Sequence, residues 1–196
     1  MRLKIMQTGE PVLREEARLL TPQEIFSEET QRLIHEMRDA MRDAPGVGLA
    51  APQIGLPLQL AVIEDREDLL EAFSADDLAE RERRPVPFHV IINPVIAYSS
   101  GEKKSFYEGC LSLPGFSAVV PRARTIRVAY LDERAERQFV EASGWYARIL
   151  QHEIDHLQGT LYIDRMSTRT FTTLDNWTRL HKAKRIPQSH SDASNE

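Results

Sequence analysis

The pentapeptide HEIDH at residues 152–156 constrains the fold of this chain more than any other sequence feature. Two histidines four residues apart lie one turn apart on the same face of an α-helix, where both can bind one cation. The motif therefore needs a helix. One is predicted over about residues 144–158, with Ser143 as its N-cap and Gly159 as its C-terminal stop. In that helix Glu153 would lie within reach of a water molecule on the cation. Without a metal, the two histidines would be ordinary residues of the helix surface or core.

The third metal ligand separates the reaction classes that use this motif. In one large class of metalloproteases it is a histidine, but this chain has Tyr162 at the corresponding position. A second class uses a glutamate further downstream, and no glutamate lies between Glu153 and Glu196. Asp164 or Asp175 would have to replace it in a metallopeptidase of that type.

Cys110 is the remaining candidate for the third ligand. A lone buried cysteine is more often a small hydrophobic residue than a ligand. Here it follows Gly109 among polar residues, and a thiolate with His152 and His156 would form a tetrahedral site whose fourth position is open for water. Because Cys110 is the only cysteine, an intramolecular disulfide framework is excluded and a reducing compartment is expected.

The composition favours one folded domain. Of 196 residues, 41% are hydrophobic and 28% are charged, which allows a sizeable core. The formal net charge of -5 argues against a protein that mainly coats nucleic acid. No apolar run is long enough to span a membrane, and residues 1–10 show neither a secretory signal nor a transit peptide. We therefore expect a cytoplasmic protein with no DNA or membrane partner, although a processed organellar protein would have the same features.

Helix and strand signals place the HExxH helix in an α+β fold. Thr21–Glu24 combines an N-cap hydroxyl, a proline at the first helical position and a glutamate at the third, which predicts a helix to about Asp43. Residues 46–55 predict a shaped loop. Short runs of β-branched and aromatic residues predict a largely antiparallel β-sheet packed around the central helix that carries H-E-x-x-H. The predicted strands are residues 59–63, 88–92, 116–120, 125–131 and 138–142.

Two segments lie outside this pattern. Residues 64–87, about half of them charged, predict a surface insertion with one or two short helical turns. A further helix is predicted over residues 172–182, followed by a mobile polar tail over residues 186–196. We therefore expect one domain at residues 1–170, and a C-terminal helix with its tail at residues 171–196.

Three motifs in order give the chain a family resemblance. The sequences GVGLAAPQ at residues 46–53, EGCLS at residues 108–112 and QHEIDHL at residues 151–157 resemble the three motifs of peptide deformylases. The resemblance covers roughly residues 5–166, with no departure at a motif position. The charged insertion resembles that of the subclass that includes organellar deformylases.

The resemblance implies an activity and a set of roles. The family hydrolyses the N-formyl group from the initiator methionine of newly made proteins and releases formate. The implied metal ligands are Cys110, His152 and His156. Glu153 is implied as the group that takes a proton from the attacking water and delivers it to the departing amine. The Gln53 side chain and the backbone N–H of Leu111 are implied as donors to the oxyanion. The resemblance implies Fe²⁺ as the native metal, with Zn²⁺, Ni²⁺ or Co²⁺ able to occupy the site, and ligand chemistry admits all of them.

Substrate contacts are assigned less directly. An apolar pocket for methionine could include Val47, Trp145 and Ile149, although the last two could equally be core residues of the helix. A peptide could add as an extra strand beside Gly48. Glu108 and Arg148 could pair near the site or lie on the surface. The full set of expected substrate-binding residues is Val47, Gly48, Glu108, Gly109, Trp145, Arg148 and Ile149.

Two other functions remain open at this point. A metallopeptidase would share the helix, the metal and the base, and a non-catalytic homologue would use the metal for structure or binding. The expected partners are formyl-methionyl nascent peptides. The segment 174–185 carries four basic residues on a predicted helix, and we expect either a transient ribosome contact or an ordinary solvated helix there. These basic residues are Arg179, Lys182, Lys184 and Arg185.

Overall fold

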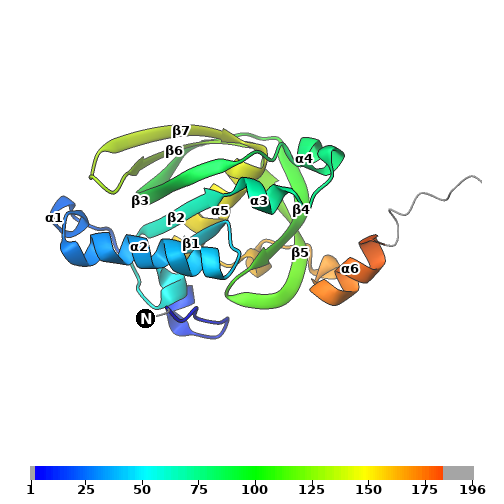
Figure 1. The fold of residues 1–196 in the computed structure, drawn as a ribbon, viewed down its shortest axis with the longest axis horizontal. Coiled ribbons are helices and arrows are strands. Elements are labelled where there is room, and N and C mark those ends of the chain that lie inside the picture. Colours follow the sequence, from blue (N-terminus) through cyan, green and yellow to red (C-terminus); the bar gives the residue numbers. More distant parts are fainter. Residues whose placement is uncertain (1–2, 183–196) are drawn as a thin grey trace, which may run out of the picture.

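The computed structural model describes residues 3–182 and confirms a mixed α+β fold with largely antiparallel sheets (Figure 1). A five-stranded sheet has the spatial order β1-β2-β3-β6-β7, and every neighbouring pair in it is antiparallel. Its strands are β1 (Gly48–Ala50), β2 (Leu60–Asp65), β3 (Val86–Ser99), β6 (Thr125–Leu131) and β7 (Arg137–Ser143). A three-stranded antiparallel sheet contains β4 (Lys103–Cys110), β5 (Leu113–Ala123) and β8 (Thr172–Thr173).

The helices connect and cover these sheets. They are α1 (Pro22–Ile25), α2 (Glu28–Asp43), α3 (Glu67–Leu70), α4 (Ala75–Arg81), α5 (Gly144–Leu157) and α6 (Leu174–Lys182). Short 3-10 turns occur at Pro11–Arg14, Ala51–Ile54, Tyr162–Asp164 and Thr168–Thr170. Among the described residues no helix is long and apolar enough to cross a membrane.

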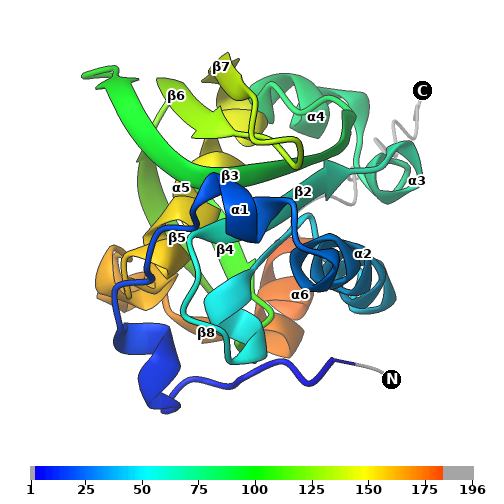
Figure 2. The same ribbon diagram turned by 90° about the vertical axis from the view of Figure 1, so that its left-hand side faces the viewer.

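Every residue of β2 is buried, because helices cover both faces of this strand. Leu60 and Val62 belong to the core cluster that contains the apolar face of α2, whereas Ala61 and Ile63 belong to the cluster that contains the apolar face of α5. Successive side chains of a strand point to opposite faces, so a continuous apolar run is what such a strand requires. The helices α2 and α5 therefore lie on opposite faces of the five-stranded sheet (Figure 2).

The helix α5, which contains residues 152–156, lies among strands of both sheets. It contacts β1, β2, β6 and β7 of one sheet and β5 of the other. Gly159 follows it with a φ of +68°, which confirms the expected C-terminal stop. Ser143 is the N-cap residue, as expected, but its side chain makes no capping hydrogen bond. Ser143 is also the last residue of β7, and Gly144 turns the chain directly from strand to helix with a φ of +60°.

Other element boundaries also differ from expectation. The single helix expected from Thr21 to Asp43 is two helices, because Ser27 provides a second N-cap by accepting a hydrogen bond from the Thr30 backbone. The capping box at Thr21 is confirmed. The expected loop at residues 46–55 contains the short strand β1 and a 3-10 turn, and β4 was not among the predicted strands.

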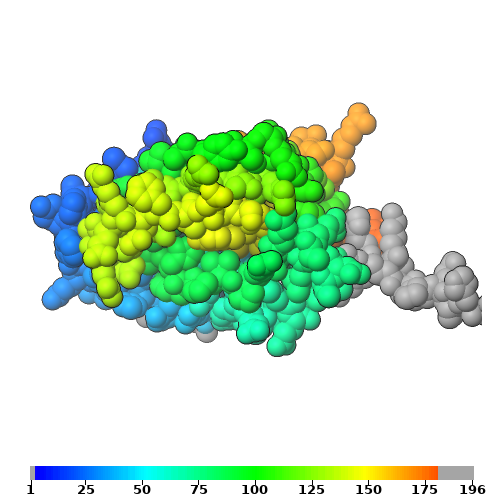
Figure 3. Space-filling view, turned by 90° about the horizontal axis from the view of Figure 1, so that it is seen from above, coloured from blue at the N-terminus to red at the C-terminus, as the bar shows by residue number. Residues whose placement is uncertain are grey.

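The ends of the molecule are partly different from the prediction. The expected helix over residues 172–182 is the short strand β8 followed by α6, and the expected tail at residues 186–196 lies outside the described part of the chain. The segment 64–87 carries the two short helices α3 and α4, but it begins inside β2 and ends inside β3. Seen from above, this segment lies beside the outward face of β6 and β7 (Figure 3).

Candidate metal centre and active site

Cys110, His152 and His156 bring one sulfur and two imidazoles together where β4 ends beside α5. Their ligand atoms all lie within 4.8 Å of one another, and Cys110 Sγ is 3.3 Å from His156 Nε2. The two histidine rings lie on one helix face with centroids 5.0 Å apart. Among the described residues, no other three His, Cys, Asp or Glu side chains converge in this way. One sulfur and two imidazole nitrogens are a donor set that suits a divalent transition metal.

The protein favours the thiolate form of Cys110. The pairing of β4 with β5 shifts register between Glu108 and Cys110, and the Ser112 backbone N–H lies 3.4 Å from the sulfur. Burial by itself would raise the pKa of the thiol. The charge of His156 and hydrogen bonds from both histidines nevertheless lower this pKa well below its ordinary value. The thiolate is the form of cysteine that binds metals.

A buried carboxylate orients the first histidine. His152 Nδ1 is 3.0 Å from Oε2 of Glu108, which leaves Nε2 as the nitrogen for a metal. Arg122 donates to both oxygens of Glu108 at 3.0 Å, and Arg148 also donates to this carboxylate. Burial would raise the pKa of Glu108, but the hydrogen bond with His152 and the charge of Arg122 hold it far below its usual range. Glu108 is therefore ionised beside the candidate ligand.

The pairing of Glu108 with Arg148 is present, and the alternative of a surface position for either residue is wrong. Their exposed fractions are 5% and 3%. Arg148 also donates to the backbone carbonyls of Val120 and Lys104, at 2.8 and 2.6 Å. This one side chain thus fastens α5 to both long strands of the β4–β5 hairpin.

Two residues that the sequence did not single out complete this network. Asp155, inside the HExxH motif, accepts hydrogen bonds from Arg122 and from two nitrogens of Arg165 at 2.7 and 2.8 Å. Arg122 is buried and joins Glu108 to Asp155. No sequence signal pointed to Arg122, because it follows Pro121 between the predicted strands 116–120 and 125–131.

Glu153 is buried next to the candidate ligands and against Gly48. A Cβ atom at Gly48 would lie 2.2 Å from Glu153 Oε1, so only glycine leaves room for this carboxylate. Burial raises the pKa of Glu153, and the charge of His152 offsets part of that rise. Within the described residues, Glu153 Oε2 has no hydrogen-bond partner. The carboxylate therefore faces the candidate site with one free oxygen and an increased affinity for a proton.

Gln53 lies in the 3-10 turn after β1 and also faces the cysteine. Its Oε1 accepts from the Ala50 backbone N–H at 2.9 Å, which is the local bond expected of an ordinary loop residue. This bond turns Nε2 toward Ser112 Oγ at 3.2 Å and Cys110 Sγ at 3.6 Å. The local bond thus aims the amide donors of Gln53 at the site. The hydroxyl of Ser112, which sequence reasoning missed, is a partner of these donors.

A cavity of about 620 Å³ opens onto this site. All seven expected substrate-binding residues line it, together with Gln53, Cys110, Leu111, His152 and Glu153. On α5 the cavity is lined by one helix face, because Trp145, Ile149 and Glu153 follow one another at intervals of one turn. Phe116 of β5 and Leu174 of α6 also line the cavity, and sequence reasoning placed neither residue there.

The alternative third ligands lie elsewhere. Asp164 forms an ion pair with Arg14 and accepts from the Leu161 backbone, and Asp175 is exposed on α6. Tyr162, at the position of the metalloprotease histidine, is buried and stacks on His152 with ring centroids 6.4 Å apart. Neither aspartate belongs to the group of ligand atoms described above.

Comparison with known proteins identifies relatives along most of the chain. The model of the family described as polypeptide deformylase matches residues 2–171. The chain is 49% identical over 173 residues to peptide deformylase 1A, chloroplastic/mitochondrial, of Arabidopsis thaliana, with 88% of this chain and 64% of that protein covered. It is 41% identical over 170 residues to the mitochondrial peptide deformylase of Homo sapiens, with 87% of this chain and 70% of that protein covered. The chain thus spans less than two thirds of the length of the plant relative.

Solved structures show the same similarity. A class I type b peptide deformylase from Acinetobacter baumannii bound to Met-Ala-Ser has a TM-score of 0.75 and 29% identity, with 85% of this chain and 99% of that chain covered. A peptide deformylase from Synechococcus elongatus in complex with actinonin has a TM-score of 0.71 and 35% identity, with 95% and 88% covered. Both resemblances cover most of this chain.

Proposed function

The chain belongs to the polypeptide deformylase family, and we propose that it removes the N-formyl group from the N-terminal formyl-methionine of newly synthesised proteins. One observation carries the proposal more than any other. A thiol and two imidazoles converge within 4.8 Å beside a buried carboxylate that lines a cavity of about 620 Å³. This arrangement would provide a metal site, a proton acceptor and room for a peptide terminus in one place.

The family depends on a metal, and the residues present here fit one. Cys110, His152 and His156 would hold it, with Nε2 of His152 presented by the hydrogen bond to Glu108. When bound, a divalent cation lowers the pKa of water toward neutrality and polarises a carbonyl oxygen. We propose Fe²⁺ as the native metal, with Zn²⁺, Ni²⁺ or Co²⁺ as ions that the same donors can accept.

Glu153 would move the proton. Its carboxylate takes a proton from the attacking water, whose oxygen adds to the formyl carbon, and later gives that proton to the departing amine as the C–N bond breaks. Formate and a free amino terminus are the products. The raised pKa of Glu153, caused by its burial, brings this group closer to the working pH of a general acid and base. Its free Oε2 and its position on the cavity wall support the same role.

Gln53 and Leu111 would stabilise the oxyanion that forms at the formyl oxygen. The Gln53 amide is held in advance by its bond to the Ala50 backbone, so its donors already face the site. The backbone N–H of Leu111 would be the second donor, beside Cys110 on the cavity wall. Removal of one such donor typically costs about 2.7–4 kcal/mol of transition-state stabilisation.

The cavity would bind the terminal methionine. Val47, Trp145 and Ile149 supply apolar surface for its side chain. Among the described residues the strand β1 pairs only with β2 in the five-stranded sheet, so its other edge, beside Gly48 and Gly109, can accept a peptide as a further strand. The relative that binds Met-Ala-Ser supports a site for a short methionyl peptide. Formyl-methionyl nascent chains are therefore the proposed substrates.

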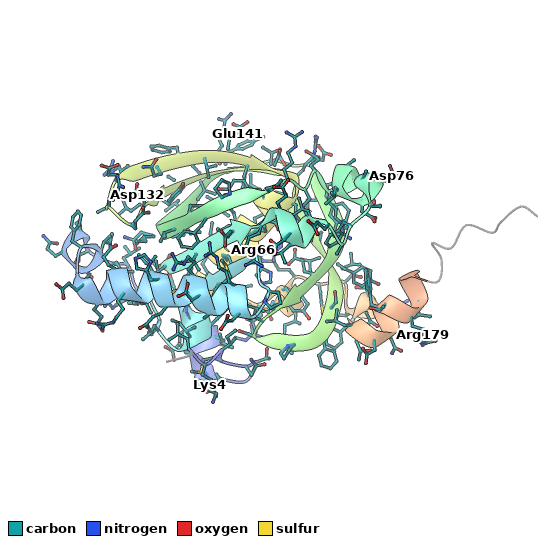
Figure 4. The ribbon with its side chains drawn as sticks, viewed as in Figure 1. Lys4, Arg66, Asp76, Asp132, Glu141 and Arg179 are labelled. Atoms are coloured by element: carbon teal, nitrogen blue, oxygen red, sulfur yellow. The ribbon has the colours of Figure 1, made fainter. Side chains whose placement is uncertain are left out.

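Partners and compartment remain parts of the proposal. Contact with the ribosome through the segment 174–185 is supported only by its basic residues, of which Lys184 and Arg185 lie outside the described part of the chain. Arg179 of α6 points away from the sheets (Figure 4). Location in the cytoplasm stays a prediction. Similarity to plant organellar and human mitochondrial deformylases supports an organelle as the alternative location.

The decisive experiment measures formate release from a short formyl-methionyl peptide by protein loaded anaerobically with Fe²⁺. A Glu153→Gln variant serves as the matched control, since Glu153 is not a proposed ligand and the variant should keep its metal. We expect release by the wild type, and a loss of at least 100-fold in the variant at equal metal content. No release from the metal-loaded wild type would reject the proposal.

A second variant tests the metallopeptidase alternative. Cys110→Ser should lose most of its metal, because the thiolate is one of three proposed ligands. An unchanged metal content, with cleavage of internal peptide bonds, would instead support a site without Cys110. Asp164 pairs with Arg14 and is not in the group of converging ligand atoms, which favours the first outcome.

A further inference from the structure

Residues 66–85 supply no lining residue to the cavity, yet they pack against the back of its wall. Arg81, at the end of α4, lies over the Trp145 ring at 5.0 Å from its centroid. Arg83, two residues later, lies 5.2 Å from the same centroid. Trp145 itself lines the cavity in the first turn of α5. The segment therefore touches the cavity through one aromatic ring.

Arg83 is held in place by a buried carboxylate. Arg83 is 7% exposed and donates two hydrogen bonds of 2.8 Å to Asp65, which is fully buried at the end of β2. Its guanidinium also lies 4.6 Å from the centroid of Phe73. A bidentate pair of this kind holds a guanidinium in one plane and one direction. Arg83 is thus a rigid contact for Trp145.

The backbone of the segment is equally close to α5. A Cβ atom at Gly144 would lie 2.4 Å from Cβ of Glu82 and 2.8 Å from the carbonyl oxygen of Arg81. Gly144 also has a φ of +60°, so its backbone conformation favours glycine as well. Glu82 is tied to Arg124 by a hydrogen bond of 2.7 Å. The end of α4 and the start of α5 are therefore in direct backbone contact.

The Trp145 ring also packs against the core cluster that contains the apolar face of α5. Within the described residues its indole Nε1 has no hydrogen-bond partner. Phe106 meets the ring edge to face at 6.5 Å between centroids, and Arg148 lies 5.8 Å from the Trp145 centroid. The orientation of Trp145 thus depends on packing and on cation–π contacts, which favour a guanidinium over the ring face.

We propose that residues 66–85 are a positioning element for substrate selection, in which Arg81 and the Asp65–Arg83 pair hold Trp145 as a fixed wall of the methionine pocket. This inference rests on the proposed function, because the side chain that Trp145 meets is taken to be that of formyl-methionine. A fixed wall accepts a long unbranched side chain and excludes a branched one of similar volume. A mobile wall discriminates less between the two.

The segment provides variants of graded severity and a matched control. Arg81→Met removes one cation and keeps most of the side-chain length. Asp65→Asn combined with Arg83→Met removes the buried pair without leaving one charge alone. Arg66→Met is the control, since Arg66 lies in the same segment at the start of α3 and pairs with Asp68 on the surface (Figure 4).

The first measurement does not depend on activity. The chain has two tryptophans, so a Trp177→Phe background leaves Trp145 as the only indole. Quenching of its fluorescence by acrylamide reports how freely the ring moves and meets solvent. We expect the quenching constant to rise about twofold or more with Arg81→Met and with the double variant, and to stay unchanged with Arg66→Met. Arg81→Lys should restore part of the wild-type value, because it retains a cation.

The second measurement tests selection. With formyl-methionyl and formyl-leucyl peptides, we expect the ratio of kcat/KM values to fall about fivefold to tenfold in Arg81→Met. The change should appear in KM, while kcat and metal content stay within about twofold of the wild type. If the double variant fails to fold, the result for Arg81→Met alone decides whether the segment affects substrate selection.

The outcomes separate this inference from the proposed function. Unchanged quenching in Arg81→Met would overturn the positioning role, whether or not the protein releases formate. Increased quenching with an unchanged ratio of kcat/KM values would overturn the link to selection. If the wild type releases no formate, the proposed function fails, and the quenching experiment still decides whether the segment holds Trp145.

Discussion

Replacement of Gly48 by alanine tests how closely the proposed base is positioned. The added Cβ would lie 2.2 Å from Oε1 of Glu153, 2.5 Å from its Cδ and 2.8 Å from its Cγ. Ordinary van der Waals contact begins near 3.4 Å, so Oε1 would have to move by about 1.2 Å. Glu153 is 3% exposed, and its surroundings leave little room for an alternative rotamer. The carboxylate would therefore leave its position beside the candidate ligands.

The expected effect is on the chemical step. A misplacement of about 1 Å can cost on the order of 100-fold, which corresponds to about 2.7 kcal/mol in the activation free energy. We expect Gly48→Ala to lower kcat by about that factor in the formate-release assay. KM should change much less, and the metal content should be that of the wild type, because Glu153 is not a proposed ligand. The fold should survive, since Gly48 does not have a positive φ.

Two comparisons make this prediction refutable. Gly101→Ala is the matched control, because a Cβ at Gly101 has no neighbour within 4 Å, and it should leave kcat unchanged. Glu153→Asp shortens the side chain by one methylene, so adding Gly48→Ala to it should cost much less than Gly48→Ala alone. A kcat for Gly48→Ala within about threefold of the wild type would refute the reasoning. Equal costs in both backgrounds would show that the clash does not act through Glu153.

Two further predictions concern stability. Arg122→Leu leaves the buried carboxylates of Glu108 and Asp155 without their shared cation. It should lower the free energy of unfolding, measured in urea, by about 3–5 kcal/mol. A loss below about 1 kcal/mol would contradict a stabilising role of these ion pairs. Glu64→Gln removes a carboxylate whose pKa is lowered by its hydrogen bonds from Arg42. Its stabilisation of about 1–3 kcal/mol is present above the unfolded pKa of about 4.3 and is lost as pH falls through the folded pKa. The difference in free energy of unfolding between wild type and variant should therefore disappear in acid. If the pair contributes nothing, this difference would not change with pH.

The helix with the motif was predictable because its signals are local. The spacing of His152 and His156 requires helical geometry, and Gly159 marks the end within two residues of Leu157. The strand β6 matches its predicted bounds, Thr125–Leu131, because its β-branched and aromatic residues stand between clear breaks. Such elements are specified by their own residues, so no knowledge of the rest of the fold is needed.

The elements that were missed take their structure from their neighbours. The strand β4 begins with exposed polar residues and has little apolar alternation, so only its pairing with β5 makes it a strand. Likewise, β1 contains only Gly48, Leu49 and Ala50, and its pairing with β2 determines its conformation. The sequence signal for a strand depends on burial of one face of that strand. It fails where hydrogen bonds to a neighbouring strand are the main reason that the segment is extended.

In the candidate site, too, residues with a local sequence signal were predicted and residues defined by distant partners were missed. The motifs pointed to Cys110, Gln53 and Glu153, which the structure places around one cavity. They assigned no role to Ser112, although it ends the motif EGCLS, and they did not include Arg122. The contacts of both residues join segments far apart in the chain. A hydrogen bond across so many residues has no local signal, since each partner alone has the features of an ordinary strand or loop residue.

Charge composition was the least reliable guide, and the reason is physical. About half of the residues at 64–87 are charged, which predicts a solvated surface, yet Asp65 and Arg83 form a pair inside the protein. Counting charges cannot distinguish a solvated side chain from one whose partner lies 18 residues away. A buried ion pair often stabilises a fold no more than apolar residues of the same volume would. Its effect is to hold one geometry, and here two of the buried pairs, Asp65–Arg83 and Glu108–Arg148, lie against Trp145 or His152 on the cavity wall. The charges of Asp65 and Arg83, which the composition assigned to the surface, are therefore placed where they can fix the site.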